Sequence, residues 1–281
     1  MNLLRLRALA NRALPFLWSL ALALVLTWPM VLRAGRAALG SQHGDGMKHL
    51  WTLWWMRSSV WDEGNFPFET LRVNFPVGMD LYPIEPLNGL MAILLPWVDV
   101  VTLSNLLVLG NLTLTGLAAY FLGRVLTGSR IAGLVSATLL EGSAIMAFFV
   151  HVGVGELNHL WWLPLGLGCL VKAHRTSEWR WFGVLAATLV GAMLSCFYLG
   201  FFLSLSVLVW TVCRLVGRVI ALSVRRKWDL IAGVGLGRLF LQYLLAATLA
   251  VMVVWPVTQS FADSYETGDV PEISLLEYVL E

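Results

Sequence analysis

Charged residues are scarce in this chain, and this scarcity decides the broad class of protein. Only 13% of the 281 residues are charged, whereas 58% are hydrophobic and the mean hydropathy is +0.76. A water-soluble domain usually carries about 25% charged residues. The net charge of +2 gives no basic surface for nucleic acid, which we exclude as a partner. The composition predicts an all-α integral membrane protein surrounded by membrane lipids.

Cysteine is also sparse, and it forms no disulfide or metal-binding pattern. Cys169, Cys196 and Cys213 all lie inside apolar runs and no CxxC spacing occurs, which supports neither a disulfide framework nor a zinc site. Internal repeats, low-complexity tracts and soluble domains are absent from the sequence. We therefore expect residues 1–281 to form a single membrane domain.

Runs of membrane-spanning length recur along the chain. We predict about seven transmembrane helices, at residues 13–33, 100–123, 131–150, 157–172, 180–196, 199–214 and 239–257. The stretch 181–213 is too long for one crossing, so we expect a hairpin with its turn between Cys196 and Gly200. A signal peptide is the alternative for the first run, but its ~30 Å length favours an uncleaved helix.

The polar segment 41–98 interrupts the hydrophobic pattern after the first helix. Its first part, residues 41–88, holds six acidic and three basic residues, whereas three arginines precede the first helix. Because Lys and Arg collect in cytoplasmic loops, we place the amino terminus in the cytoplasm and both this loop and the C-terminal tail outside a cytoplasmic membrane. Two juxtamembrane helices are expected within the loop, at about 46–61 and 86–98, the second being too short to cross.

Polar residues gather on the predicted outer face in two groups, one opening the long loop and one joining the third and fourth spans. The candidate site residues are Asp45, Lys48, His49, Arg72, His151, Glu156 and His159. Structural alternatives exist for several of them. Asp45 is also suited to capping a helix, Glu156 to a favourable position at a helix start, and the histidines to the membrane interface rather than to a metal.

Glu141 is the one carboxylate near the middle of a predicted span. An ionised carboxylate there costs at least ~2.5 kcal/mol, so we expect its side chain to face the bundle interior or a wet cavity. A structural hydrogen bond and a functional role are both open for this residue.

The order of these features resembles the C-type membrane glycosyltransferases (GT-C), a superfamily that includes oligosaccharyltransferases, protein mannosyltransferases and lipid A aminoarabinose transferases. In that superfamily a long external loop with an early acidic residue follows the first helix, a second acidic site follows the third, and the common module has seven spans. Asp45 matches the first acidic position, and Glu156 lies near the second. Residues 74–78 and 83–87 resemble the proline-rich segment before the second juxtamembrane helix.

The resemblance implies transfer of a sugar from a polyprenyl-phosphate carrier to an acceptor at the outer face. Asp45 would be the catalytic base and Glu156 a second catalytic residue. Either a divalent metal would be held by Glu156 with His151 or His159, or Lys48 or Arg72 would meet the lipid phosphate instead. The substrate-binding candidates as a group are Lys48, His49, Arg72, His151 and His159.

Two departures from the superfamily pattern leave alternatives open. Neither Asp45 nor Glu156 is followed by a second acidic residue, which leaves metal dependence undecided. The chain stops at Glu281, just past the seventh predicted span, so we expect either a partner subunit or a missing C-terminal domain. A transporter or flippase, and a non-catalytic membrane scaffold, are the alternative functions.

Overall fold

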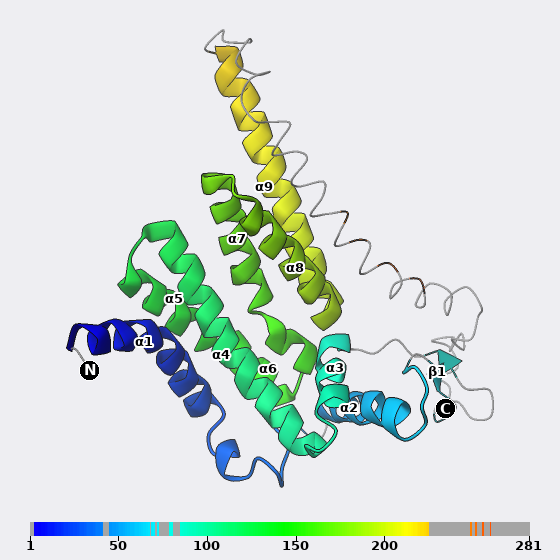
Figure 1. Ribbon diagram of the computed structural model, residues 1–281. Helices are drawn as coiled ribbons and strands as arrows, with labels where there is room; N and C mark the ends of the chain where they lie inside the picture. The colour runs from blue at the N-terminus through cyan, green and yellow to red at the C-terminus, as the bar shows by residue number, and fades with distance from the viewer. Residues whose placement is uncertain are drawn as a thin grey trace, which may run out of the picture.

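Helices make up almost all of the described structure. The computed structural model describes residues 3–41, 45–67, 69–70, 72, 79–80 and 85–224, together with the isolated positions 248, 251, 255 and 259. The α-helices are α1 (Leu3–Leu26), α2 (Gly46–Trp61), α3 (Pro86–Leu94), α4 (Val100–Thr127), α5 (Arg130–Glu141), α6 (Ala144–Val152), α7 (Trp162–Thr176), α8 (Trp179–Ser195) and α9 (Phe197–Val224) (Figure 1). Two 3₁₀ helices, η1 (Met30–Leu32) and η2 (Gly155–His159), join them. The predicted helical class is confirmed.

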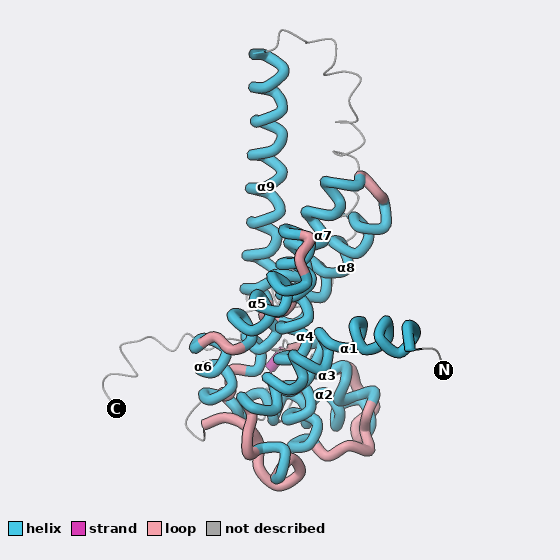
Figure 2. The backbone as a smooth tube through the Cα atoms, turned by 90° about the vertical axis from the view of Figure 1, so that its left-hand side faces the viewer, coloured by secondary structure: helices cyan, strands magenta, loops and turns pink. Residues whose placement is uncertain are grey.

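A two-stranded antiparallel sheet is the exception to the helical pattern in this part of the chain. Strand β1 (Glu69–Thr70) pairs with β2 (Met79–Asp80), with Glu69 opposite Asp80 and Thr70 opposite Met79. Figure 2 shows how small this pair is beside the helices. It lies in the long loop between α2 and α3.

Helix α4 organises the bundle, because it contacts α1, α5, α7, α2 and η2. The side chain of Asp99 caps its start by accepting a 2.9 Å hydrogen bond from the Thr102 N–H, and Gly128 ends it at a φ of 75°. Its 28 residues rise about 42 Å, which exceeds the ~30 Å hydrocarbon core of a bilayer. Helix α4 is thus long enough to connect the two ends of the molecule.

Among the described residues, two helices are long and apolar enough to cross a membrane: Val100–Thr127 and the Phe197–Arg214 part of α9. Helices α5 and α6 pass the same test together, with a 40° bend at the break between them, and count as a third span if taken as one. The break falls at Gly142 and Ser143, where the Ser143 side chain caps α6. These candidate spans indicate a membrane protein.

The prediction of seven membrane-spanning helices is wrong, because several of the expected spans are too short or begin later than expected. In the part of α1 whose side chains are described, the apolar segment Arg12–Leu26 is about 22 Å long, and Pro29 follows the end of the helix. Helix α8 has 17 residues, which also falls short. The span expected at 157–172 begins only at Trp162, because polar η2 takes its place. Nearly all of 239–257 lies outside the described residues.

Helices α8 and α9 form a helical hairpin that turns at Cys196, where the turn was expected; the two membrane crossings stay a prediction. Helix α8 ends at Ser195, Cys196 is extended with φ −160° and ψ 117°, and α9 starts at Phe197. Its helices pack with α7 around a shared apolar cluster. The buried members of this cluster are Cys169, Leu170, Leu185, Leu189, Ala192 and Leu203.

The loops separate to the two ends of α4 as the charge pattern predicts. At the Thr127 end, Arg175 Nη1 donates a 2.5 Å hydrogen bond to the Val125 carbonyl, and Arg214 Nε lies 3.0 Å from His174 Nε2. At the Val100 end, η2 packs on α4, and α2 and α3 contact each other (Figure 1). The basic connections therefore share one end and the two candidate loops share the other.

Helices α2 and α3 occupy the ranges expected for the two loop helices. Helix α2 has the predicted bounds, while α3 ends at Leu94 rather than 98. Pro96 explains the early end, because the residue before a proline disfavours the α conformation. Their location at the membrane surface stays a prediction.

Candidate functional site

Glycines bring the two candidate loops into backbone contact. Gly40 and Gly153 have φ angles of 125° and 82°, and a Cβ on Gly40 would lie 2.9 Å from the Cα of Gly153. Beside them, the Ser41 N–H donates a 3.4 Å hydrogen bond to the Val152 carbonyl. Only glycine adopts such φ angles easily while leaving this little space between two chains. The start of the first loop is thereby fixed against the start of η2.

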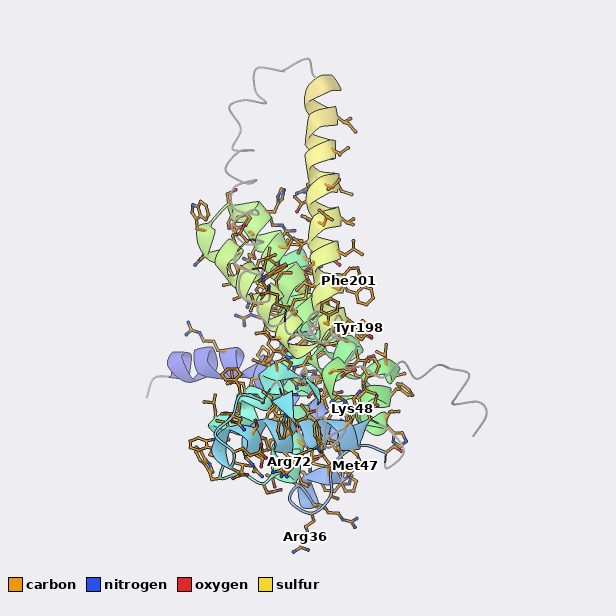
Figure 3. The ribbon with its side chains drawn as sticks, turned by 90° about the vertical axis from the view of Figure 1, so that its right-hand side faces the viewer. Arg36, Met47, Lys48, Arg72, Tyr198 and Phe201 are labelled. Carbon is orange, nitrogen blue, oxygen red and sulfur yellow. The ribbon has the colours of Figure 1, made fainter. Side chains whose placement is uncertain are left out.

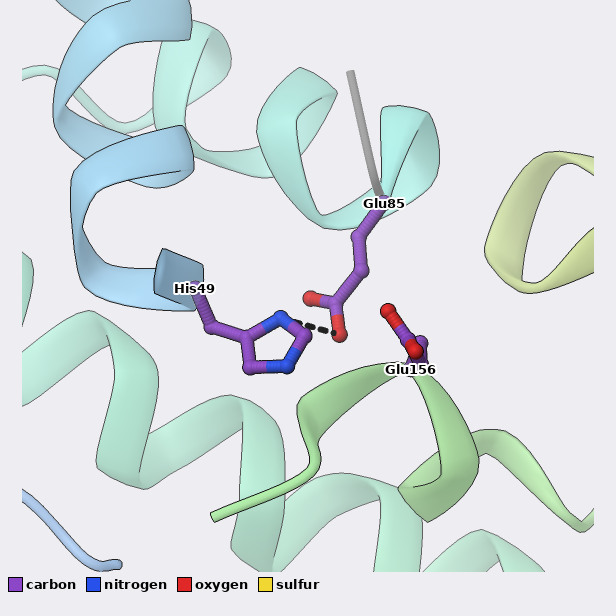
Figure 4. A group of neighbouring side chains, drawn as sticks. All are labelled: His49, Glu85 and Glu156. Carbon is purple, nitrogen blue, oxygen red and sulfur yellow. Dashed lines mark ion pairs between the residues drawn. The ribbon is translucent and has the colours of Figure 1, made fainter. Parts of the chain in front are cut away.

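This contact helps to place three titratable side chains from separate elements around one point. His49 comes from the first turn of α2, Glu85 from the residue preceding α3, and Glu156 from η2. One ligand atom from each lies within 4.8 Å of the others (Figure 4). We call these three residues the His49 cluster.

His49 and Glu85 form the buried part of the cluster. His49 Nδ1 lies 3.0 Å from Glu85 Oε1, and the two side chains are only 5% and 3% exposed. The other oxygen, Glu85 Oε2, accepts a 2.7 Å hydrogen bond from Asn88 Nδ2. Burial raises the pKa of Glu85, but His49 and Asn88 outweigh it and bring the pKa below its ordinary value. Glu85 is therefore a buried carboxylate.

Glu156 is the half-buried member of the cluster. Burial raises the pKa of its carboxyl group; Lys48 and His49 oppose the rise, and the negative charges of Glu85 and Asp45 add to it. These interactions place Asp45 and Lys48 within electrostatic reach of Glu156. A carboxyl group crowded by other carboxylates and partly removed from water gains stability from a proton or another cation.

Asp45 and Lys48 lie at the exposed rim of the same region. Their side chains are 3.6 Å apart and 49% and 41% exposed. Asp45 occupies the residue before α2, as expected for a cap, but its carboxylate accepts no capping hydrogen bond. The carboxylate of Asp45 faces Lys48 instead, so a helix-capping role does not account for it.

A small cavity lined by both polar and apolar residues adjoins the His49 cluster. It has ≈ 20 Å³ of room for the centres of water molecules, enough for about one water. Its polar lining residues are His49, Glu85, Asn88, Ser104, Asn111 and Asn158. Asn158 is 1% exposed, and neither of its amide atoms has a hydrogen-bond partner among the described residues. Because buried polar groups are normally paired, this cavity is suited to a water or an ion.

The remaining predicted site residues lie outside the cluster. His159 is buried, and its ring nitrogens have no hydrogen-bond partner in the described structure. Burial lowers the pKa of His159, although the negative charge of Glu85 opposes this shift. His151 is exposed in the last turn of α6. Arg72 Nε donates a 2.8 Å hydrogen bond to Glu63, and the guanidinium lies 5.3 Å from the Trp54 ring centroid. Their roles in binding stay predictions.

Glu85 is the cluster member that sequence analysis did not select as a candidate. It appears in the sequence as one of several acids in a long loop, immediately before Pro86. Its apolar neighbours Ile84 and Leu87 are the available signal, since an acid within an apolar stretch is often buried with a partner. The identity of that partner, His49, depends on how α2 packs on α3.

Comparisons with known proteins give no relative for this chain. No protein-family model, curated protein or solved structure matches it.

Proposed function

We propose that this protein is a membrane glycosyltransferase that moves a sugar from a polyprenyl-phosphate donor to an acceptor at the outer face of the cytoplasmic membrane. The supporting observation is the convergence of two acidic positions, Asp45 and Glu156, from separate loops at one end of a helical membrane bundle, with Lys48 in reach of both. A solvent-accessible carboxylate beside a cation is what this reaction requires.

The transfer reaction assigns a task to each rim residue. The oxygen of an acceptor hydroxyl forms a bond to the anomeric carbon while the bond from that carbon to the phosphate oxygen breaks. Asp45 takes the hydroxyl proton, and the polyprenyl phosphate leaves with the bonding electron pair. Lys48 faces the negative charge that grows on the phosphate. Glu156 is close enough to the pair to stabilise positive charge developing on the sugar.

The surface of α9 supports a lipid-linked donor. Tyr198 and Phe201 are 63% and 51% exposed on this helix, and Figure 3 shows them above the level of Lys48 and Arg72. An amphiphile with a phosphate head needs cationic side chains at the level of its head and apolar surface beyond them. The aromatic side chains of Tyr198 and Phe201, placed above the cationic Lys48 and Arg72, match that requirement.

The test is release of polyprenyl phosphate from a panel of polyprenyl-phosphate sugars by the purified protein. We expect Asp45→Asn to lower the turnover about 10²- to 10⁴-fold, the usual contribution of a general base. Glu178→Gln is the matched control, because Glu178 precedes α8, at the end of the bundle opposite Asp45. Both variants are compared at equal folded fraction, measured by thermal unfolding in detergent.

The outcomes separate this proposal from its alternatives. Turnover that persists in Asp45→Asn would remove Asp45 as the base. Donor binding and transmembrane movement without any sugar release would identify a flippase or transporter. Absence of both donor binding and turnover would leave a scaffold as the function.

A further inference from the structure

We propose that His49, Glu85 and Glu156 bind a divalent transition-metal ion. The inference goes beyond the transferase proposal, since the donor set would bind the ion whatever reaction the protein performs. It starts from the grouping of one imidazole and two carboxylates, with one atom of each within 4.8 Å of the others (Figure 4).

The cluster is already close to the dimensions of a metal site. Ligand atoms bound about 2.1 Å from a tetrahedral ion lie about 3.4 Å from one another. The 3.0 Å separation of His49 Nδ1 and Glu85 Oε1 is near that value, so the main adjustment is an inward movement of Glu156. This side chain is the half-buried one, and side-chain rotation is easier there than in a packed core.

Unpaired buried atoms are the second, independent indication of a bound ligand. His49 is 5% exposed; its Nδ1 faces Glu85 Oε1, but its Nε2 has no hydrogen-bond partner in the described structure. Asn158 is fully buried in the adjoining cavity, and both of its amide atoms are unpaired. Buried polar atoms left unpaired cost ~1–3 kcal/mol each. A metal ion and a coordinated water would satisfy several of these atoms together.

Neighbouring residues also hold the side chains of the His49 cluster in place, as a metal site requires. Asn88 holds the second oxygen of Glu85 through a 2.7 Å hydrogen bond, which orients the carboxylate toward His49. Gly155 brings the backbone of η2 against the same pair, with room for no side chain between them. Metal ligands are typically fixed in this way by a surrounding shell of hydrogen bonds and packing.

The donor set selects among metals. One nitrogen and two oxygens suit Zn²⁺ or Mn²⁺ better than Ca²⁺, which takes six to eight oxygen ligands, or Mg²⁺, which keeps most of its waters. Affinity of such a site rises from Mn²⁺ toward Zn²⁺. We therefore expect one Zn²⁺ per chain, with weaker Mn²⁺ binding and the weakest binding for Mg²⁺.

The test is titration of the chelator-treated protein with Zn²⁺, Mn²⁺ and Mg²⁺ by calorimetry, with metal content measured after dialysis. We expect His49→Ala to weaken Zn²⁺ binding at least about 100-fold, since replacing even outer partners of a ligand costs 10- to 100-fold. Glu156→Gln should act in the same direction, and its half-buried side chain makes it the safer variant for folding. Glu178→Gln is the matched control for Glu156→Gln, because Glu178 precedes α8 at the opposite end of the bundle and lies outside the cluster.

Each result either supports or overturns the site. Loss of Zn²⁺ binding in both ligand variants, with retention in Glu178→Gln and unchanged metal-free unfolding temperatures for Glu156→Gln, supports it. Wild-type protein that binds no Zn²⁺ or Mn²⁺ at one ion per chain would overturn it and leave a buried His–Glu ion pair. Equal binding by wild type and Glu156→Gln would overturn it as well. The titration contains no donor or acceptor, so failure of metal binding is distinct from failure of sugar transfer.

Discussion

Gly155 lies directly against Glu85, with no space for a side chain between them. A Cβ built on Gly155 would be 2.5 Å from Glu85 Oε1 and 3.0 Å from Cγ of His49. The contact joins η2 to the buried ion pair and sets the position of Glu156, the next residue in the chain.

Gly155→Ala should therefore push η2 away from the His49 cluster. We expect Zn²⁺ affinity to fall by about tenfold or more, comparable with the loss of an outer partner of a metal ligand, while the fold is kept. Gly183→Ala is the control, because a Cβ at Gly183 meets nothing within 4 Å. The measurement is the Zn²⁺ titration described above, and an unchanged affinity in Gly155→Ala would contradict the packing of η2 on the pair.

Gly116 gives a second steric prediction, within the bundle. A Cβ at this position would overlap Glu141 Oε2 and Ser19 Oγ, and Glu141 is completely buried. Gly116→Ala should destabilise the protein by about 1–3 kcal/mol, the usual cost of overpacking. Gly110→Ala, on the same helix with nothing within 4 Å, should be neutral or stabilising by up to about 1 kcal/mol.

Thermal unfolding of both α4 variants in detergent distinguishes these outcomes. Equal unfolding temperatures for Gly116→Ala and Gly110→Ala would mean that Glu141 does not pack against α4 as described. Placement of Glu141 inside the bundle agrees with its expected position, because the middle of a membrane helix is unfavourable for an exposed carboxylate.

Buried His159 predicts loss of stability in mild acid. Its pKa is lowered in the folded protein from an ordinary 6.5, so below that pH the unfolded chain binds a proton that the folded protein resists. The free energy of unfolding should fall as the pH decreases from 7 to about 5. His159→Gln should remove this part of the dependence, measured as unfolding temperature against pH.

Two other titratable groups of the site, Glu85 and Glu156, help to define the pH range for that measurement. The lowered pKa of Glu85 gives stability that is lost only as the pH falls below its ordinary value of 4.5. The raised pKa of Glu156 acts in the opposite direction, since the folded protein holds that proton more tightly. The difference in unfolding temperature between wild type and His159→Gln at each pH isolates the contribution of His159. Parallel curves for the two proteins would contradict the prediction.

The separation of loops to two ends of α4 predicts their labelling pattern. In a variant whose three cysteines are replaced, Asp45→Cys and Glu156→Cys should react with an impermeant maleimide from outside intact cells. Thr176→Cys is exposed in the last turn of α7, at the opposite end, and should react only after permeabilisation. Labelling of position 156 only after permeabilisation would reject this orientation.

Local features of the fold could be predicted from the sequence because their signals are local. The bounds of α2 follow from a polar, glycine-containing start and a helical apolar pattern, and the turn at Cys196 follows from the length of the 181–213 run. The number of spans could not be predicted as well. Hydropathy does not show that polar residues 155–159 form a separate 3₁₀ helix.

Most residues of the candidate site could be selected from the sequence. Its two loops were predicted to share one face, and Asp45, Lys48, His49 and Glu156 were selected as candidates. The pairing of Glu85 with His49 was not predicted, because it depends on the packing of α3 against α2 across a loop of more than twenty residues. No spacing rule in the sequence connects these two side chains.

Helix α9 is too long to fit within the hydrocarbon core of a bilayer when it lies perpendicular to the membrane. Its 28 residues rise about 42 Å, whereas the hydrocarbon thickness is about 30 Å. Figure 1 shows the helix extending beyond its neighbours. The helix must tilt or carry its last turns into the aqueous phase. Membrane thickness would then set how far those turns project, which makes the position of α9 sensitive to the lipid composition around it.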